Sequence, residues 1–416
     1  MLQLHSTRSW EFLLEETSRI IISQPRRSNA KGSSSEGSSN TVPESESFKD
    51  IEMGPIPPKW KGECMTGQNF PTTSCNKKLI GARYYKDEDN ATEILTARDE
   101  NGHGTHVAST IAGASVQSAS YYGLAAGVAK GGSPASHLAM YRVCSSDGCT
   151  GSAIFAAFDD AIADGVDLLS LSLGSSPAFA PDFSTDPIAI GAFHAVQKGI
   201  TIVCSAGNAG PMVQSVVNMA PWIITVAATT IDRDLQSNVI LGNNKVVKGE
   251  SINFLELKKT PTYPLIHGGA AKTKSATEAE ARKIKGKIVF CQNDDKSEYS
   301  QRGKQLGLQS GGAIRMIITN DKKRLAASNT GTFPMTAISS KDGKEILAYI
   351  NATENAVATI LPTKTVLNFK PAPSVAYFSS RGIAAEVEST NPSWSPAAIR
   401  AGESDRGTTT KTGLRH

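Results

Sequence analysis

Short apolar runs alternate with segments of helical periodicity between residues 79 and 210, and this alternation restricts the fold more than any other feature of the sequence. Three runs have the length and apolar character of buried strands, at residues 137–144, 166–173 and 199–204. Two segments repeat apolar residues at helical spacing, at residues 152–163 and 187–198. Strands and helices that alternate at this interval predict an α/β fold with a parallel sheet. We therefore expect ligands beyond the carboxyl ends of the strands.

A histidine lies within a glycine-rich bend ahead of another helical segment. Residues 99–110 read Asp-Glu-Asn-Gly-His-Gly-Thr-His-Val-Ala-Ser-Thr. Gly102 and Gly104 bracket His103, and apolar residues recur at helical spacing after it, so we expect His103 in the first turn of a helix. The positive end of the helix dipole disfavours imidazolium, which suits a neutral, base-competent ring. A helix cap or a core pair formed by His103 and His106 fits these residues equally well.

A second stretch carries one amide side chain on a turn. Residues 201–211 form a short apolar strand that runs into small residues around Asn208. An amide donor on a rigid turn suits acyl transfer, because negative charge grows on the scissile carbonyl oxygen in the transition state. Together, the histidine and asparagine stretches resemble the subtilisin-like serine proteases, or subtilases. The resemblance implies a parallel sheet with helices on both faces and catalytic roles for His103 and Asn208. We expect no cofactor and no catalytic metal, and a stabilising calcium stays open because members of the family differ in it.

The ends of two predicted strands gain a role through the same resemblance. In subtilases the backbone that corresponds to Ser172, Leu173 and Gly174 pairs with an extended substrate chain. The residues that match Ala206 and Gly207 wall the pocket for the residue before the cleaved bond, and Ser205 leads into that wall; the candidate substrate-binding residues are therefore Ser172, Leu173, Gly174, Ser205, Ala206 and Gly207. From the residues alone, the simpler interpretation is that 172–174 only end a strand.

The resemblance covers most of the chain from Pro43 to Arg400. Residues 81–86 and 150–167 look most like the carbon-dioxide-responsive secreted proteases of plants. From about residue 258 charged helices alternate with apolar strands, and this part resembles the protease-associated domain that plant subtilases carry as an insert. A plain structural module is the alternative interpretation of the insert.

These observations divide the chain into six parts. Residues 24–47 have almost no apolar side chains and are rich in Ser, Gly, Asn, Pro and Glu, which predicts a flexible linker. The expected parts are 1–23, a remnant of the propeptide junction; 24–47, the linker; 48–257, the first part of the catalytic domain; 258–365, the protease-associated domain; 366–400, a remnant of the second part of the catalytic domain; and 401–416, an aberrant polar tail.

Two motifs of the family have no counterpart in this sequence. The family carries its aspartate in an apolar strand that ends Asp-Thr-Gly, just before the segment matching residues 43–48, where this chain reads Ser-Ser-Asn-Thr-Val. Its Gly-Thr-Ser-Met motif lies between the counterparts of Arg381 and Trp394, where this chain has no serine between glycine and methionine. Ser379 and Ser380 correspond to structural positions. A histidine base needs both a nucleophile and a group that fixes its tautomer, so we expect the chain as written to be inactive, with a central strand missing from its sheet.

Four of the six cysteines lie in two close pairs, Cys64 with Cys75 and Cys144 with Cys149. Close pairs can be disulfides or metal ligands. Neither pair has the two-residue spacing or the nearby histidines of a zinc site, so disulfides are the favoured interpretation.

Disulfides and two glycosylation sequons, at Asn90 and Asn351, indicate the secretory pathway or the cell exterior. The resemblance implies secretion to the apoplast or cell wall, although no signal peptide is visible in the chain. No apolar run approaches the length of a bilayer span. With 43 basic and 39 acidic residues, the net charge of +4 is too small to favour nucleic acid or an anionic membrane as a partner.

Three functions follow as hypotheses. The first is a secreted serine endopeptidase that cleaves protein or peptide substrates, of which this chain is an incomplete version. The full-length relative would also bind its own propeptide. The second is a non-catalytic pseudoprotease that binds a protein or a propeptide. The third is a metal-dependent hydrolase that uses His103 and His106, which is disfavoured because no carboxylate accompanies the pair at the spacing that zinc hydrolases use.

Overall fold

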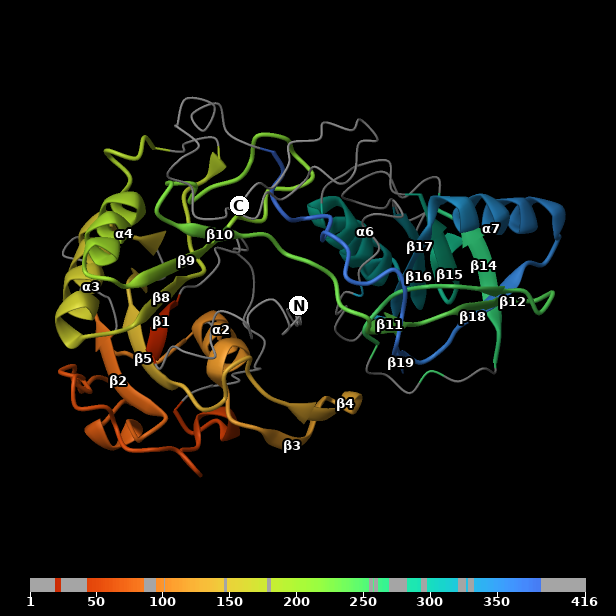
Figure 1. Ribbon diagram of the computed structural model, residues 1–416. Coiled ribbons are helices and arrows are strands. Elements are labelled where there is room, and N and C mark those ends of the chain that lie inside the picture. The colour runs from red at the N-terminus through yellow and green to blue at the C-terminus, as the bar shows by residue number, and fades with distance from the viewer. Residues whose placement is uncertain are drawn as a thin grey trace. The chain divides into compact units, whose positions relative to one another are not determined.

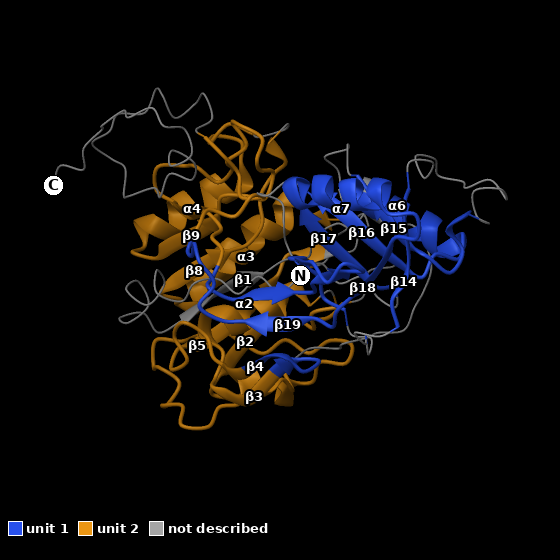
Figure 2. Ribbon diagram, turned by 90° about the vertical axis from the view of Figure 1, so that its right-hand side faces the viewer, with its two compact units in different colours: residues 1–3, 120–126, 231–373 blue, residues 4–119, 127–230, 374–416 orange. Residues whose placement is uncertain are grey.

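The computed structural model describes residues 19–23, 43–85, 95–100, 102–145, 148–177, 181–253, 257, 261–268, 283–292, 298–320, 327 and 333–382. The chain divides into two compact units, which Figure 2 shows in blue and orange. Unit 1 contains residues 120–126 and 231–373, and unit 2 contains the rest of the described residues. Each unit has its own sheet and its own core.

Unit 2 is built on a parallel six-stranded sheet in the order β10-β9-β8-β1-β5-β2 (Figure 1). The strands are β1 (Arg19–Ser23), β2 (Leu79–Tyr84), β5 (His137–Arg142), β8 (Leu168–Leu171), β9 (Thr201–Ser205) and β10 (Ile224–Val226). The helices are α2 (His103–Ala112), α3 (Gly151–Asp164) and α4 (Pro187–Gln197). The predicted strands and helices between residues 137 and 204 are therefore confirmed.

Helices cover both faces of this sheet. Leu169 and Leu171 of β8 lie in one core with residues of α3 and α4, whereas Leu168 lies in a second core with residues of α2. Side chains of a strand alternate between its faces, so this division assigns α3 and α4 to one face and α2 to the other. The subtilisin-like α/β architecture that the sequence predicts is confirmed in this unit.

The centre of the sheet is occupied by β1, which corrects the expectation of a missing central strand. β1 pairs in parallel with β5 on one side and with β8 on the other. Its sequence, Arg-Ile-Ile-Ile-Ser, has the β-branched run that suits an inner strand. Without it, the facing edges of β5 and β8 would leave backbone donors and acceptors unmatched. The strand itself contains no aspartate.

Other parts of unit 2 begin and connect this sheet. A short 3₁₀ helix at Glu46–Phe48 is capped by Ser45 and buries Phe48, so order is present before the end of the predicted linker. Residues 24–42 of that linker lie outside the described part. Two hairpins follow α2 and β5: β3 (Val116–Tyr121) with β4 (Leu124–Ala129), of which residues 120–126 belong to unit 1, and β6 (Cys144–Ser145) with β7 (Gly148–Cys149).

Unit 1 carries a mixed seven-stranded sheet in the order β13-β12-β18-β14-β15-β16-β17. Its elements are β11 (Asp234–Gln236), β12 (Val239–Leu241), β13 (Val246–Val247), β14 (Tyr263–His267), β15 (Ile288–Cys291), α6 (Glu298–Ser310), β16 (Arg315–Asn320), β17 (Met335–Ser339), α7 (Ser340–Ala352), β18 (Val357–Ile360) and β19 (Lys364–Val366).

The long segment of unit 1 runs from Ile231 to Pro373, whereas the sequence-based boundaries were expected at residues 258 and 365. β11 explains the difference, because it pairs with β19 and ties residues 234–236 to unit 1. The assignment of this unit as a protease-associated domain stays a prediction. None of the described helices in either unit is both long and apolar enough to cross a bilayer.

Candidate functional site

His103 is the first residue of α2, as its glycine-bracketed bend predicts. Gly102 precedes it with a φ of 86°, a left-handed conformation that glycine adopts without strain. His103 is half-buried, and its Nδ1 atom is shielded from solvent. The ring therefore lies at the helix N-terminus and is not part of the helix's apolar core.

Asp99 caps this helix, a contact that the sequence analysis missed. Its Oδ1 atom accepts a hydrogen bond from the Gly102 nitrogen at 2.8 Å, and its Oδ2 atom accepts from the nitrogen and hydroxyl of Thr105 at 2.7 and 2.9 Å. A carboxylate in this position satisfies free N–H groups and interacts favourably with the helix dipole. The bend that holds His103 is thus fixed from both sides.

The predicted substrate-binding residues leave two neighbouring strands at one edge of the sheet. β8 and β9 are parallel, and their ladder ends with the pair Leu171 and Cys204. Residues 172–174 and 205–207 therefore continue side by side from the carboxyl ends. A crossover helix runs back against its preceding strand, so α2, which follows β2, also starts at this edge. The topology brings the three predicted segments to the same edge of unit 2, while their roles stay predictions.

Asn208 is exposed on the turn that follows β9. Gly207 has a φ of 95°, which allows the turn. Beneath it, the Ala206 nitrogen donates to the Val226 oxygen at 2.8 Å, which ties the turn to β10. An amide that projects from an anchored turn is a pre-positioned hydrogen-bond donor.

A buried segment near residue 380 holds the other side of this turn. The Ser380 nitrogen donates to the Gly207 oxygen at 3.0 Å, and the Gly210 nitrogen donates to the Phe378 oxygen at 2.9 Å. Ser379 and Ser380 are both 0% exposed, and the Ser379 hydroxyl accepts from the Ala228 nitrogen at 3.2 Å. These serines make backbone contacts, as their predicted structural role requires. Residues 383–416, where the family's serine motif would lie, are outside the described part.

Both predicted disulfides are present. Cys64 is bonded to Cys75, and Cys144 is bonded to Cys149 within the β6–β7 hairpin. Cys204 and Cys291 are free and buried. Burial raises the pKa of the Cys204 thiol, and it raises the pKa of Cys291 to about 11, so neither thiol ionises readily near neutral pH.

Other candidate sites give fewer leads. Asn351 is exposed at the end of α7, and Asn90 lies outside the described residues. The described parts of the chain contain no group of three or more His, Cys, Asp or Glu residues that could hold a metal ion.

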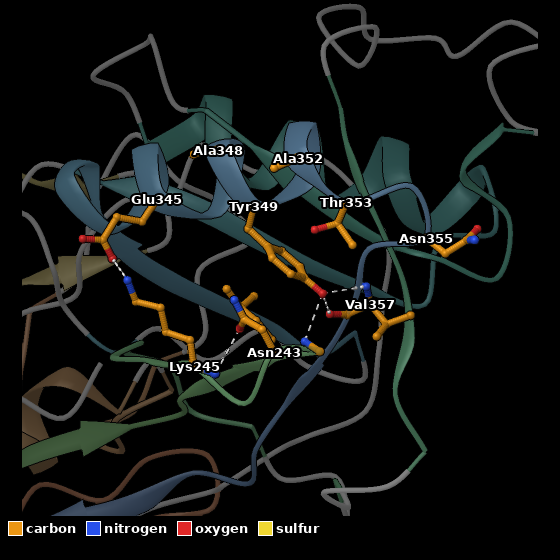
Figure 3. Close-up of a pocket in the computed structure, with 11 residues that line it drawn as sticks. Asn243, Lys245, Glu345, Ala348, Tyr349, Ala352, Thr353, Asn355 and Val357 are labelled. Atoms are coloured by element: carbon orange, nitrogen blue, oxygen red, sulfur yellow. Dashed lines mark hydrogen bonds and ion pairs between the residues drawn. The ribbon is translucent and has the colours of Figure 1, made fainter.

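A shallow hollow of about 620 Å³ lies in unit 1 between α7 and the β12–β13 hairpin (Figure 3). The Tyr349 hydroxyl at its centre accepts from the Gly242 nitrogen at 3.1 Å and donates to the Val357 oxygen at 3.2 Å. Lys245 forms an ion pair with Glu345 at 2.7 Å. Because these polar groups already bond to one another, we interpret them as structural contacts between α7 and the β12–β13 hairpin.

Comparisons with known proteins point in one direction. The model of the subtilase family matches residues 72–403. The chain is 55% identical over 395 residues to the CO(2)-response secreted protease of Arabidopsis thaliana, a match that covers 91% of this chain and 51% of that protein. It is 46% identical over 409 residues to subtilisin-like protease SBT5.1 of the same plant, covering 92% and 51%. It is 42% identical over 405 residues to subtilisin-like serine-protease S of Lotus japonicus, covering 92% and 52%. The chain thus spans about half the length of the curated relatives it matches.

Proposed function

Because this chain belongs to the subtilase family, we propose that it is a form of a secreted plant serine endopeptidase, a class of enzyme that cleaves peptide bonds in extracellular proteins. The observation that carries this proposal is the common edge of the unit 2 sheet at which α2 starts and β8 and β9 end. The relative with 55% identity is a secreted protease by name, which supports both the proteolytic activity and the extracellular location proposed here. Its partners are protein substrates and, in the full-length protein, its own propeptide.

Each predicted site residue has a defined task in this proposal. His103 takes the proton from the nucleophilic hydroxyl, and the Asn208 amide donates a hydrogen bond to the oxygen on which negative charge grows. The backbone of residues 172–174 pairs with the extended substrate, as an added strand does. Residues 205–207 form the wall beside the cleaved bond. This chemistry needs only side chains and backbone groups.

We propose further that the chain as written does not hydrolyse peptide bonds. β1 has the sequence Arg-Ile-Ile-Ile-Ser and offers no carboxylate to orient His103. Between Arg381 and Trp394 the sequence has no Gly-Thr-Ser-Met motif to supply a nucleophile. In subtilisin, removing the serine lowers turnover about a millionfold and removing the aspartate lowers it by roughly ten-thousandfold. The rate that Asn208 and binding alone can support is then hard to detect.

A second candidate function is peptide binding without cleavage. The strand ends that would bind an extended peptide do not depend on the missing motifs, and β8 and β9 pair normally up to Leu171 and Cys204. An extended segment, such as a substrate or the family's propeptide, gains affinity from main-chain hydrogen bonds along such an edge. This candidate is the non-catalytic pseudoprotease expected from the sequence.

A fluorophosphonate probe separates these alternatives, because it labels an activated serine. The secreted chain is incubated with the probe, with the 55% identical relative as positive control. We expect labelling of the relative alone. Labelling of this chain that a His103→Ala substitution abolishes would overturn the proposed inactivity.

Binding is measured in parallel by the fluorescence anisotropy of labelled oxidised insulin B chain, an extended peptide. We expect Gly174→Val to weaken binding by filling the strand end. Gly343→Val is the matched control, since a Cβ built there would also crowd a side chain, 2.1 Å from a Thr319 methyl carbon, but Gly343 lies in unit 1. Equal affinity of the two variants would count against binding at this edge.

A further inference from the structure

Asn218 lies in the loop between β9 and β10, and no sequence pattern singled it out. It is 6% exposed, and its side-chain nitrogen donates to the Leu173 oxygen at 2.8 Å and to the Ser205 oxygen at 2.9 Å. Leu173 belongs to the first predicted substrate-binding segment and Ser205 to the second. One amide therefore joins the two segments through both of its N–H groups.

The position of this bridge explains why it is needed. The pairs between β8 and β9 end at Leu171 and Cys204, so beyond that point no backbone hydrogen bond of this ladder joins the two segments, although Ser205 still pairs with Val226 of β10. Buried carbonyl groups need donors, and two carbonyl oxygens that approach each other repel unless a donor lies between them. The Asn218 amide supplies a further rung at the place where the ladder stops.

The neighbouring residues leave no room for the bridge to shift. A Cβ built at Gly174 would lie 3.0 Å from the Asn218 side-chain nitrogen and 3.0 Å from a methyl carbon of Val217. A Cβ built at Gly207 would lie 3.2 Å from the same Val217 methyl carbon. The absence of side chains at both glycines lets the two segments close directly onto Val217 and Asn218.

The backbone of Asn218 is itself anchored. Its φ of 59° is left-handed, a conformation that asparagine tolerates better than most residues. The Thr225 hydroxyl on β10 donates to the Asn218 oxygen, and the Val217 nitrogen donates to the Ala206 oxygen at 3.1 Å. The amide is thus held by backbone contacts on one side and by the two carbonyl groups on the other.

We propose that Asn218 is a positioning residue that sets the separation of the two peptide-binding segments, 172–174 and 205–207. This inference rests on the proposed function for its consequence, since that separation decides whether an extended peptide meets both segments together. In a catalytic site, a misplacement of about 1 Å can lower the reaction rate roughly a hundredfold, which shows how narrow such geometric tolerances are. Asn218 touches neither peptide nor reacting atoms in this role and acts through the strand ends.

The test compares Asn218→Asp with Asn253→Asp. Asn253 is also 6% exposed, and its amide donates to the Ser237 hydroxyl at 2.9 Å and to the Met335 oxygen at 3.0 Å, but it lies in unit 1. Both substitutions keep the side-chain shape and replace a buried donor with a carboxylate oxygen. Because the two asparagines lie in different units, Asn253→Asp controls for the introduction of a buried carboxylate, and hydrogen exchange of residues 151–164 in α3 measures any general loss of stability in unit 2. A loss of strand-end spacing changes exchange at the strand ends and leaves α3 unchanged.

Two readouts are taken on the full chain: amide hydrogen exchange in peptides covering residues 168–176 and 201–209, and anisotropy of labelled oxidised insulin B chain. We expect Asn218→Asp to accelerate exchange in both peptides and to raise the Kd by at least about tenfold. Asn253→Asp leaves both readouts at the wild-type level. Unchanged exchange in Asn218→Asp, or equal effects in the two variants, would overturn the proposal.

The two proposals fail in distinguishable ways. If the wild-type chain binds no peptide, the binding function fails, and the exchange comparison still decides whether Asn218 holds the strand ends. If Asn218→Asp does not accumulate, Asn218→Ala and Asn253→Ala give the same comparison without a buried charge.

Discussion

The hydroxyl of Ser380 accepts a hydrogen bond of 3.2 Å from the backbone nitrogen of Ala209, the residue directly after Asn208. Ser380 is 0% exposed. A Cβ built at Gly207 would lie 2.8 Å from the hydroxyl oxygen of Ser380. The turn that presents the candidate oxyanion donor therefore depends on a serine far along the chain. In this family's fold a hydroxyl can serve the site without being its nucleophile.

We expect Ser380→Ala to lower the free energy of unfolding of unit 2 by about 0.5–1.5 kcal/mol, because it leaves the half-buried Ala209 N–H without this acceptor. Thermal unfolding measures the loss of stability, and hydrogen exchange of residues 201–209 shows whether the loss is located at this turn. Ser184→Ala, at an exposed serine, is the control and should change stability by less than about 0.5 kcal/mol. Equal stability of the two variants would contradict the role of Ser380.

Asp99→Ala should destabilise the first turn of α2 by about 0.5–2 kcal/mol, because the variant loses every hydrogen bond that the carboxylate accepts. Asp99→Asn should retain part of this stability, since its amide oxygen still accepts. Hydrogen exchange of residues 103–112 reports the change directly. Asp159→Ala, at an exposed position on α3, controls for the loss of a surface charge.

Lys78 predicts a pH dependence of stability. Its ammonium group is 0% exposed and donates to the Pro134 and Ser136 oxygens at 2.8 and 2.7 Å, and burial lowers its pKa to about 8. The unfolded chain keeps the ordinary value of 10.5, so between these values it binds more protons than the folded chain. The contribution of Lys78 to the free energy of unfolding therefore increases as the pH rises from about 8 toward 10.5.

Lys78→Met removes the titrating group while keeping most of the side-chain length. Its free energy of unfolding should increase less between pH 7 and pH 9 than that of the wild type, and denaturant unfolding at the two pH values measures the difference. The variant should also be less stable at pH 7, because two buried carbonyl groups lose a donor. Parallel pH profiles of the two proteins would refute the assignment.

The two disulfides should differ in their contribution to stability. Cys64 and Cys75 are separated by 11 residues, whereas Cys144 and Cys149 are separated by 5. The chain-entropy argument gives roughly 3 kcal/mol for the longer loop and about 2 kcal/mol for the shorter one. Cys64→Ser with Cys75→Ser should therefore lower the unfolding temperature more than Cys144→Ser with Cys149→Ser. Calorimetry of the two double variants checks the order.

The parallel sheet could be predicted because its elements have strong local periodicity. β5, β8 and β9 are continuous apolar runs, and α3 begins after Thr150, which caps it by accepting from the Ala153 nitrogen. The bend before His103 was also visible, since two glycines bracket the residue. Asp99 could have been found in the same way, because a carboxylate shortly before a helix is a known start signal.

Other features could not be predicted because they depend on distant partners. β1 is a short isoleucine run beside a polar, low-complexity segment, and only its pairing with β5 and β8 makes it a strand. Asn218 carries no local signal, since its importance comes from the Leu173 and Ser205 oxygens. Single-sequence patterns describe neighbours along the chain, whereas these contacts are made across the fold.

The place of β1 in the middle of the sheet has a consequence for how the protein is made. β1 leaves the ribosome before both of its partners, which begin at His137 and Leu168. The sheet therefore cannot close until the nascent chain has extended well past both partners, and pairings between such distant segments form slowly. Until then the Ile-Ile-Ile run has no strand partner, so a chaperone that shields this run during translation would raise the yield of folded protein.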